Sequence, residues 1–262
     1  MSLSHTPLED DVCDVIGKAI HGLDLSLAQL AKITKLPESD IHAALAGQQD
    51  DRILKQIAAS LQLSPSALVG LSSYQPEASA PDGLVRIVSP FGHAGVNAYI
   101  IIMGQHALAF DTGTDASPLI EYLEQHQLVL DALYITHRHH DHTAGIKSFG
   151  ETRIIYPEDT QHGQTAKTHS GNKLTAIDVS GHINPARAYY YDGLSVPVCI
   201  IGDSVFAGSM GKSPNSESYK LALKTAKENL MTLSSNTVLC PGHGPLTTVG
   251  LEKVHNAFLG LD

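Results

Sequence analysis

Cysteine and cationic side chains are both scarce in this sequence of 262 residues. The three cysteines, Cys13, Cys199 and Cys240, are odd in number, widely spaced and set in apolar surroundings, which argues against a disulfide framework. Lysine and arginine number 17 against 27 acidic residues, so the formal charge is −10. This balance disfavours nonspecific attraction to nucleic acid or to an anionic membrane surface.

Long apolar runs are also missing. No run approaches the roughly 20 residues that a helix needs to cross a bilayer, and residues 1–5 lack the basic start of a secretion signal. The Gly-x-Ser-x-Gly pattern of serine hydrolases is absent too. We therefore expect a cytoplasmic protein without a membrane partner, and a hydrophobic content of 42% is enough for two domains with their own cores.

The most informative stretch is residues 134–142, where an apolar strand-like run ends in a group of ionisable residues. His137 and His139 are two residues apart and project to the same side of an extended backbone. Asp141 and His142 follow at once, and a helix beginning near Asp141 would direct them to a second ion about 3.5–4 Å away. Because imidazole and carboxylate suit zinc and related first-row ions, this stretch predicts metal binding.

Isolated polar residues elsewhere in the chain complete this set. His182, Asp203 and His243 each follow a strand-like run and a glycine. Side chains at strand ends of this kind can converge at one edge of a sheet. The sequence therefore offers seven ligands, enough for two metal positions.

Together these residues resemble the metallo-β-lactamase-fold hydrolases. The resemblance extends from about residue 84 to residue 259 and rests on His-x-His-x-Asp-His at 137–142, Gly-His at 181–182, Gly-Asp-Ser-Val-Phe-Ala-Gly-Ser at 202–209 and Pro-Gly-His-Gly-Pro at 241–245. It implies an α+β fold, a four-layer αββα sandwich. It also implies that His137, His139 and His182 bind one metal, that Asp141, His142 and His243 bind the other, and that Asp203 bridges the two.

The resemblance implies further roles outside the ligand set. Asp111 would brace the metal loop from a buried position, with a plain turn aspartate as the alternative. Tyr189 falls where glutathione thioesterases of the glyoxalase II type carry a substrate-contacting tyrosine, although aromatic strand residues usually belong to the core. Lys212 is a candidate for meeting a substrate carboxylate. After His182 the chain reads Ile-Asn-Pro-Ala, where the family usually has Thr-x-Gly, so this loop departs from the pattern.

Residues 1–71 predict a small all-α domain. Apolar periodicity and stop signals indicate helices at residues 8–22, 27–31, 38–45, 51–61 and 65–68. Their order over residues 23–71 resembles the helix-turn-helix domain of Cro/C1-type repressors. The presumptive recognition helix, residues 38–45, contains Glu38 and Asp40 but no lysine or arginine, whereas DNA binding depends on such cations. We expect no DNA binding here, and a role in homodimer formation or docking instead.

Residues 72–82 are rich in serine, alanine and proline and predict a linker. The catalytic domain then covers residues 83–262, with β-strands at 84–88, 98–103, 106–110, 129–136, 153–156 and 173–179, and helices at 118–127, 141–149 and 216–233. Residues 157–172 are polar and predict a loop with exposed His162 and His169.

Two adjacent cations would lower the pKa of a shared water and polarise a scissile carbonyl, while Asp141 orients the nucleophile. The predicted activity is hydrolysis of a small thioester or ester at two divalent ions, with zinc preferred to iron or manganese. The C-terminal part resembles the short glyoxalase II-like hydrolases, so a glutathione thioester is the expected substrate. A lactonase, a single-iron persulfide dioxygenase, and a DNA-binding regulator with a metallo-domain sensor are the alternatives.

Overall fold

The computed structural model of the chain describes residues 6–76, 78–93 and 95–260. The predictions for residues 1–5 lie outside these ranges. Its N-terminal part is a helical unit in which side chains of Asp11, Ser26, Asp50 and Ser64 cap the helices that they precede. The elements are α1 (Val12–Gly22), α2 (Leu27–Thr34), α3 (Glu38–Leu45), α4 (Asp51–Ser60), α5 (Pro65–Gly70) and the 3-10 turn η1 (Leu71–Ser73).

The first sheet has the strand order β1-β2-β3-β4-β5. The strands β1, β2 and β3 are antiparallel neighbours, whereas β4 and β5 continue the sheet in parallel. Its strands are β1 (Leu84–Ser89), β2 (Val96–Met103), β3 (His106–Phe110), β4 (Val129–Tyr134) and β5 (Ile154–Ile155), and the associated helices are α6 (Ser117–Gln125), α7 (His140–Thr143), η2 (Ile146–Phe149) and η3 (Pro157–Asp159).

The second sheet has the strand order β13-β12-β9-β8-β7-β6. Here β12 and β9 are parallel, so their C-terminal ends reach the same edge. The elements are β6 (Thr165–Lys167), β7 (Lys173–Asp178), β8 (Arg187–Tyr191), β9 (Val198–Gly202), β12 (Val238–Pro241) and β13 (Thr247–Thr248), the hairpin β10 (Val205–Phe206) and β11 (Ser209–Met210), and the helices α8 (Ser216–Thr225), η4 (Ala226–Leu230) and α9 (Val249–His255).

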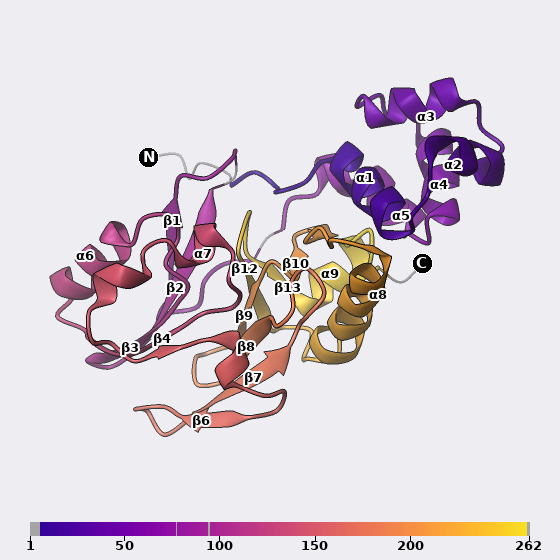
Figure 1. The fold of residues 1–262 in the computed structure, drawn as a ribbon. Helices are drawn as coiled ribbons and strands as arrows, with labels where there is room; N and C mark the ends of the chain where they lie inside the picture. The colour runs from indigo at the N-terminus through magenta and orange to yellow at the C-terminus, as the bar shows by residue number, and fades with distance from the viewer. Residues whose placement is uncertain (1–5, 77, 94, 261–262) are drawn as a thin grey trace.

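Alternating strand residues build the layers. In β2, Ala98 and Ile100 pack towards α6, whereas Tyr99 and Ile101 pack between the sheets. In β9, Ile200 joins the same central layer and its neighbours face α8. Figure 1 shows the result, with α6 on one outer side and α8 and α9 on the other. The predicted α+β fold, a four-layer αββα sandwich preceded by a helical region, is thereby confirmed.

The helical unit packs directly on the outer helices of the second sheet. Apolar side chains of α1, α4 and α5 form one continuous core with those of α8 and the second sheet. The contact is close, because a Cβ atom on Gly22 would lie 2.3 Å from the ring of Tyr219 in α8. The helices therefore share a core with the sandwich, as their position beside α8 in Figure 1 also shows.

Three local predictions differ from the structure. The helix predicted for residues 141–149 is the short helix α7 followed by the 3-10 helix η2. The polar stretch 157–172 contains η3 and the edge strand β6, which pairs with β7. The helix predicted for residues 216–233 changes at Thr225 into the π-turn η4. Among the described residues, no helix is long and apolar enough to cross a membrane.

Candidate metal centre

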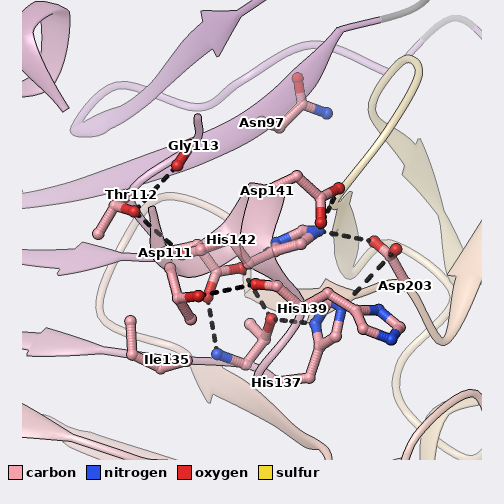
Figure 2. Close-up of polar contacts among 12 residues, drawn as sticks. Asn97, Asp111, Thr112, Gly113, Ile135, His137, His139, Asp141, His142 and Asp203 are labelled. Atoms are coloured by element: carbon pink, nitrogen blue, oxygen red, sulfur yellow. Dashed lines mark hydrogen bonds and ion pairs between the residues drawn. The ribbon is translucent and has the colours of Figure 1, made fainter. Parts of the chain in front are cut away.

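The seven residues predicted as ligands converge at one edge of the two sheets. His137 follows β4, while His139, Asp141 and His142 lie in and beside the short helix α7. His182, Asp203 and His243 come from the turns after β7, β9 and β12. Figure 2 shows His137, His139, Asp141, His142 and Asp203 turned towards one another. Loops of different strands thus bring residues from distant parts of the sequence into one site.

His137, His139 and His182, here called the first triad, point their nitrogens at a common centre. His139 Nδ1 lies 3.1 Å from His137 Nε2 and 3.0 Å from His182 Nε2. Asp203 Oδ2 closes the group at 3.8 Å from His137 Nε2 and 3.6 Å from His182 Nε2. Zinc–nitrogen bonds of about 2.0–2.1 Å give a tetrahedron with edges of about 3.3–3.4 Å. The observed separations are close to these edges.

Asp141, His142 and His243, the second triad, form a matching group on the other side of Asp203. Asp141 Oδ2 lies 3.2 Å from His243 Nε2 and 3.7 Å from His142 Nε2. Asp203 Oδ1 is 3.2 Å from His142 Nε2, and its Oδ2 is 3.5 Å from His243 Nε2. Asp203 therefore faces both triads, and this chain has two ligand groups that share one carboxylate.

The chemistry of the donor set fits divalent cations. Within the described part of the chain, His142 Nε2 and Asp203 Oδ1 are buried atoms that make no hydrogen bond, a costly arrangement for polar groups that nothing coordinates. Each lies within the second triad and its shared carboxylate. Nitrogen and oxygen ligands in such numbers suit zinc, iron or manganese.

Hydrogen bonds hold the imidazole rings from behind. Nδ1 of His142 lies 2.8 Å from Asp111 Oδ2, that of His182 lies 2.6 Å from the Lys212 carbonyl, and that of His243 lies 2.7 Å from the Gly95 carbonyl. These contacts place a proton on Nδ1 and turn Nε2 towards the ligand group as the atom that would bind metal.

Asp111 lies at the centre of this support. Its Oδ1 accepts from the Thr136 backbone N–H at 2.7 Å and its Oδ2 from the Thr136 hydroxyl at 2.7 Å. That hydroxyl in turn lies 3.0 Å from His137 Nδ1. The carboxylate thus fixes a ring from each triad, His137 through Thr136 and His142 directly. Figure 2 shows Asp111 beside His142.

The pKa values separate the two triads. Burial and the neighbouring His142 hold the pKa of His137 well below its usual value, so this imidazole is neutral and has a free lone pair. Burial opposes ionisation of Asp203, but His142 and His137 outweigh it and hold its pKa well below the usual range.

In the second triad the balance is reversed. Burial lowers the pKa of His243, but its hydrogen bonds with Asp141 and Asp203 outweigh this effect and raise the pKa to about 10. A cation bound there has to displace a proton, so metal binding releases protons at neutral pH.

The two expected substrate contacts, Tyr189 and Lys212, differ in their exposure to solvent. Tyr189 is 1% exposed and packs between the sheets, where its hydroxyl donates to the Ile135 carbonyl at 3.1 Å. This buried position gives it no surface for a substrate. Lys212 is exposed and directly adjoins the His182 ring through its carbonyl.

Asn97 and Gly95 contribute to the site without having been identified from the sequence. The Asn97 amide nitrogen donates to the carbonyls of Pro241 and Gly244, which flank the turn carrying His243. The Gly95 carbonyl holds the His243 ring itself. Asn97 could have been identified as a candidate because it is a polar residue in an otherwise apolar strand. The contribution of Gly95 comes from its backbone carbonyl, which the residue type does not reveal.

Comparisons with known proteins agree with this geometry. Residues 92–158 match the family profile described as Metallo-beta-lactamase superfamily. The hydroxyacylglutathione hydrolase of Serratia proteamaculans is 27% identical over 53% of this chain and 57% of its own length. The probable metallo-hydrolase YqgX of Bacillus subtilis is 25% identical over 65% of this chain and 95% of its own.

Solved structures extend the comparison to the fold. A metallo-beta-lactamase from Staphylococcus aureus superposes with a TM-score of 0.61 at 20% identity, covering 71% of this chain and 64% of that one. The fold is therefore that of the metallo-beta-lactamase structures, residues 92–158 match the superfamily profile, and hydroxyacylglutathione hydrolases are among the relatives at low identity.

Proposed function

We propose that this chain is a binuclear metallo-hydrolase that cleaves small thioesters or esters, with zinc as the first choice of metal. The observation that carries the proposal is the pair of ligand groups that share Asp203. The first triad and Asp203 would hold one ion, and the second triad and Asp203 the other. The curated relatives named hydroxyacylglutathione hydrolase favour a glutathione thioester, although their match spans little more than half of their length.

Divalent ions held by these residues would supply Lewis acidity, which polarises an acyl carbonyl and lowers the pKa of a bound water. The protein's part is to fix the geometry. Asp141 Oδ2, 3.2 Å from His243 Nε2, is in place to orient the attacking water as well as to bind metal. Hydrogen bonds from the rings to Asp111, Gly95 and Lys212 fix the orientation of the imidazoles, so the ligand atoms need to move little when metal binds.

Metal analysis combined with a substrate panel tests the proposal. We expect close to two equivalents of zinc or a similar metal and measurable but poorly saturating hydrolysis of S-lactoylglutathione. Asp203→Ala should lose metal from both positions and with it the activity, because both groups share this carboxylate. Asp192→Ala, which makes the same change at an exposed position outside the ligand groups, is the matched control.

Other outcomes would point to other functions. A single tightly bound iron with oxygen consumption in the presence of glutathione persulfide would identify a persulfide dioxygenase. Lactone opening by metal-loaded protein that leaves thioesters untouched would identify a lactonase.

Lys212 is our proposed contact for a substrate carboxylate, since the residue is exposed and its backbone carbonyl lies 2.6 Å from His182 Nδ1. Removing its charge should weaken substrate binding and leave the ligands in place. Lys212→Ala should raise KM several-fold and change kcat less, which steady-state kinetics will show. Lys224→Ala, on an exposed part of α8, serves as the control; an unchanged KM for Lys212→Ala would exclude this contact.

A further inference from the structure

The N-terminal segment, residues 6–18, lies against the loops that carry the second triad and Asp203. His93 Nε2, in the loop between β1 and β2, lies 3.1 Å from the Leu8 carbonyl. Arg86 donates through Nη2 to the Thr6 hydroxyl at 2.9 Å and through Nη1 to the Gly244 carbonyl at 3.3 Å. One arginine thus joins the start of the segment to the turn that holds His243.

Glu9 brings a carboxylate to His243 itself. Its Oε2 lies 4.0 Å from His243 Nδ1, on the side of the ring that faces away from Asp141 and Asp203. The backbone is equally close, because a Cβ atom on Gly244 would lie 3.2 Å from Glu9 N. A carboxylate beside the distal nitrogen of a metal-binding imidazole orients the ring and strengthens it as a ligand.

Lys18 fixes the loop after Asp203. Its Nζ pairs with Asp10 and donates to the Met210 carbonyl at 2.8 Å, and both charged side chains are largely buried. Met210 belongs to the hairpin β10–β11, which returns so tightly that a Cβ atom on Gly211 would lie 1.9 Å from the Asp203 carbonyl oxygen. Lys18 Nζ also lies 5.1 Å from the centre of the Phe206 ring, whose edge contacts His243.

We infer that the N-terminal segment is a built-in support of the second metal position, with Glu9 and Lys18 as positioning residues. Glu9 acts on His243, and Lys18 acts on the hairpin that packs against Asp203. The helical unit begins with this segment, so the unit helps to position the residues of the second metal position. This inference rests on the proposed binuclear function, because it assigns these residues a role towards the second ion.

Zinc titration of the full-length protein against a chromophoric chelator tests the inference without relying on activity. We expect Glu9→Gln to bind the first zinc as the wild type does and the second about 10–100-fold more weakly. Lys18→Met should weaken the second zinc to a similar extent and the first zinc as well, because the hairpin that Lys18 holds adjoins Asp203, which both ligand groups share. Lys18→Arg, which keeps the cation, should restore most of the lost affinity. Matched controls are Glu38→Gln and Lys32→Met, which make the same changes on exposed positions of α3 and α2.

Circular dichroism and thermal unfolding of each variant separate loss of fold from loss of support. Should Lys18→Met fail to fold with Asp10 left unpaired, Glu9→Gln carries the test, since glutamine keeps the shape of the side chain. Second-zinc affinities equal to those of the controls would overturn the inference. A wild-type protein that takes up no second zinc would instead refute the proposed function, and this inference with it.

Discussion

At the scale of single residues, Asp111 contacts the rings of both triads without belonging to either ligand group. Asp111 accepts three hydrogen bonds, two from Thr136 and one from His142, and is 2% exposed. Its backbone has a φ of +57°, which a non-glycine residue adopts at some cost. The surrounding contacts hold this conformation, so the Asp111 side chain reaches a ring of each triad.

Asp111→Asn should therefore weaken metal binding with little change in shape. The amide keeps one acceptor but presents an N–H group where Thr136 and His142 donate. We expect zinc affinity at the second position to fall about 10–100-fold, as measured by chelator competition. Asp192→Asn supplies the control, because this carboxylate is exposed and lies outside the ligand groups. Equal affinities for the two variants would show that Asp111 is only a turn residue.

At the scale of elements, the tight hairpin β10–β11 fixes the position of Asp203. Gly211 follows β11, and the space for a side chain there is already filled by the Asp203 carbonyl oxygen and the His182 ring. The shared ligand and a ligand of the first triad therefore both depend on this glycine. A substitution outside the ligand set can thus disturb both metal positions.

Gly211→Ala should reduce bound zinc at both positions, since the new Cβ atom would lie 1.9 Å from the Asp203 carbonyl oxygen and 3.0 Å from the His182 ring. Metal analysis after purification measures the loss. Gly17→Ala in α1 is the control, because nothing lies within 4 Å of its added Cβ, and alanine within a helix should stabilise it by about 0.5–1 kcal/mol. Full metal content in Gly211→Ala would show that the hairpin can move away.

An element could be predicted from the sequence when the residues that determine it are close together in the chain. Helices α2 and α4 begin at Ser26 and Asp50, whose side chains cap them, so a few neighbouring residues suffice to identify each start. The layers follow from alternating residues in strands such as β2 and β9. The π-turn η4 has no comparable local signal, and the helix over 216–233 was accordingly predicted too long.

The same reasoning applies to the site. The candidate ligands within residues 137–142 can be identified from their residue types and spacing. The candidate ligands elsewhere in the sequence, His182, Asp203 and His243, each follow a glycine. The position of Glu9 beside His243 joins the two ends of the chain and depends on how the helical unit packs, which no short motif encodes. Tyr189 is the opposite case. The resemblance to glyoxalase II-type thioesterases suggests a substrate contact at this position, whereas the packing of the two sheets buries the side chain.

At the scale of the whole molecule, charge and packing both bear on the role of the helical unit. Helices α1 and α5 share a core with the second sheet, whereas α3 carries Glu38 exposed to solvent and Asp40 half-buried. DNA-binding proteins gain affinity by neutralising phosphates with lysine or arginine, and α3 has neither. The chain as a whole carries a formal charge of −10, which adds to the repulsion.

We therefore expect the full-length protein to give no mobility shift with genomic DNA fragments, even at low salt, where phosphate contacts are strongest. The double variant Glu38→Lys, Asp40→Lys reverses the charge of α3 and is the positive comparison, since it should gain weak, salt-sensitive binding if α3 is presented as the resemblance to Cro/C1-type repressors implies. A sequence-specific footprint of the wild type with a steep salt dependence would contradict the prediction. It would make the alternative of a DNA-binding regulator the better account, with the metal centre as its sensor.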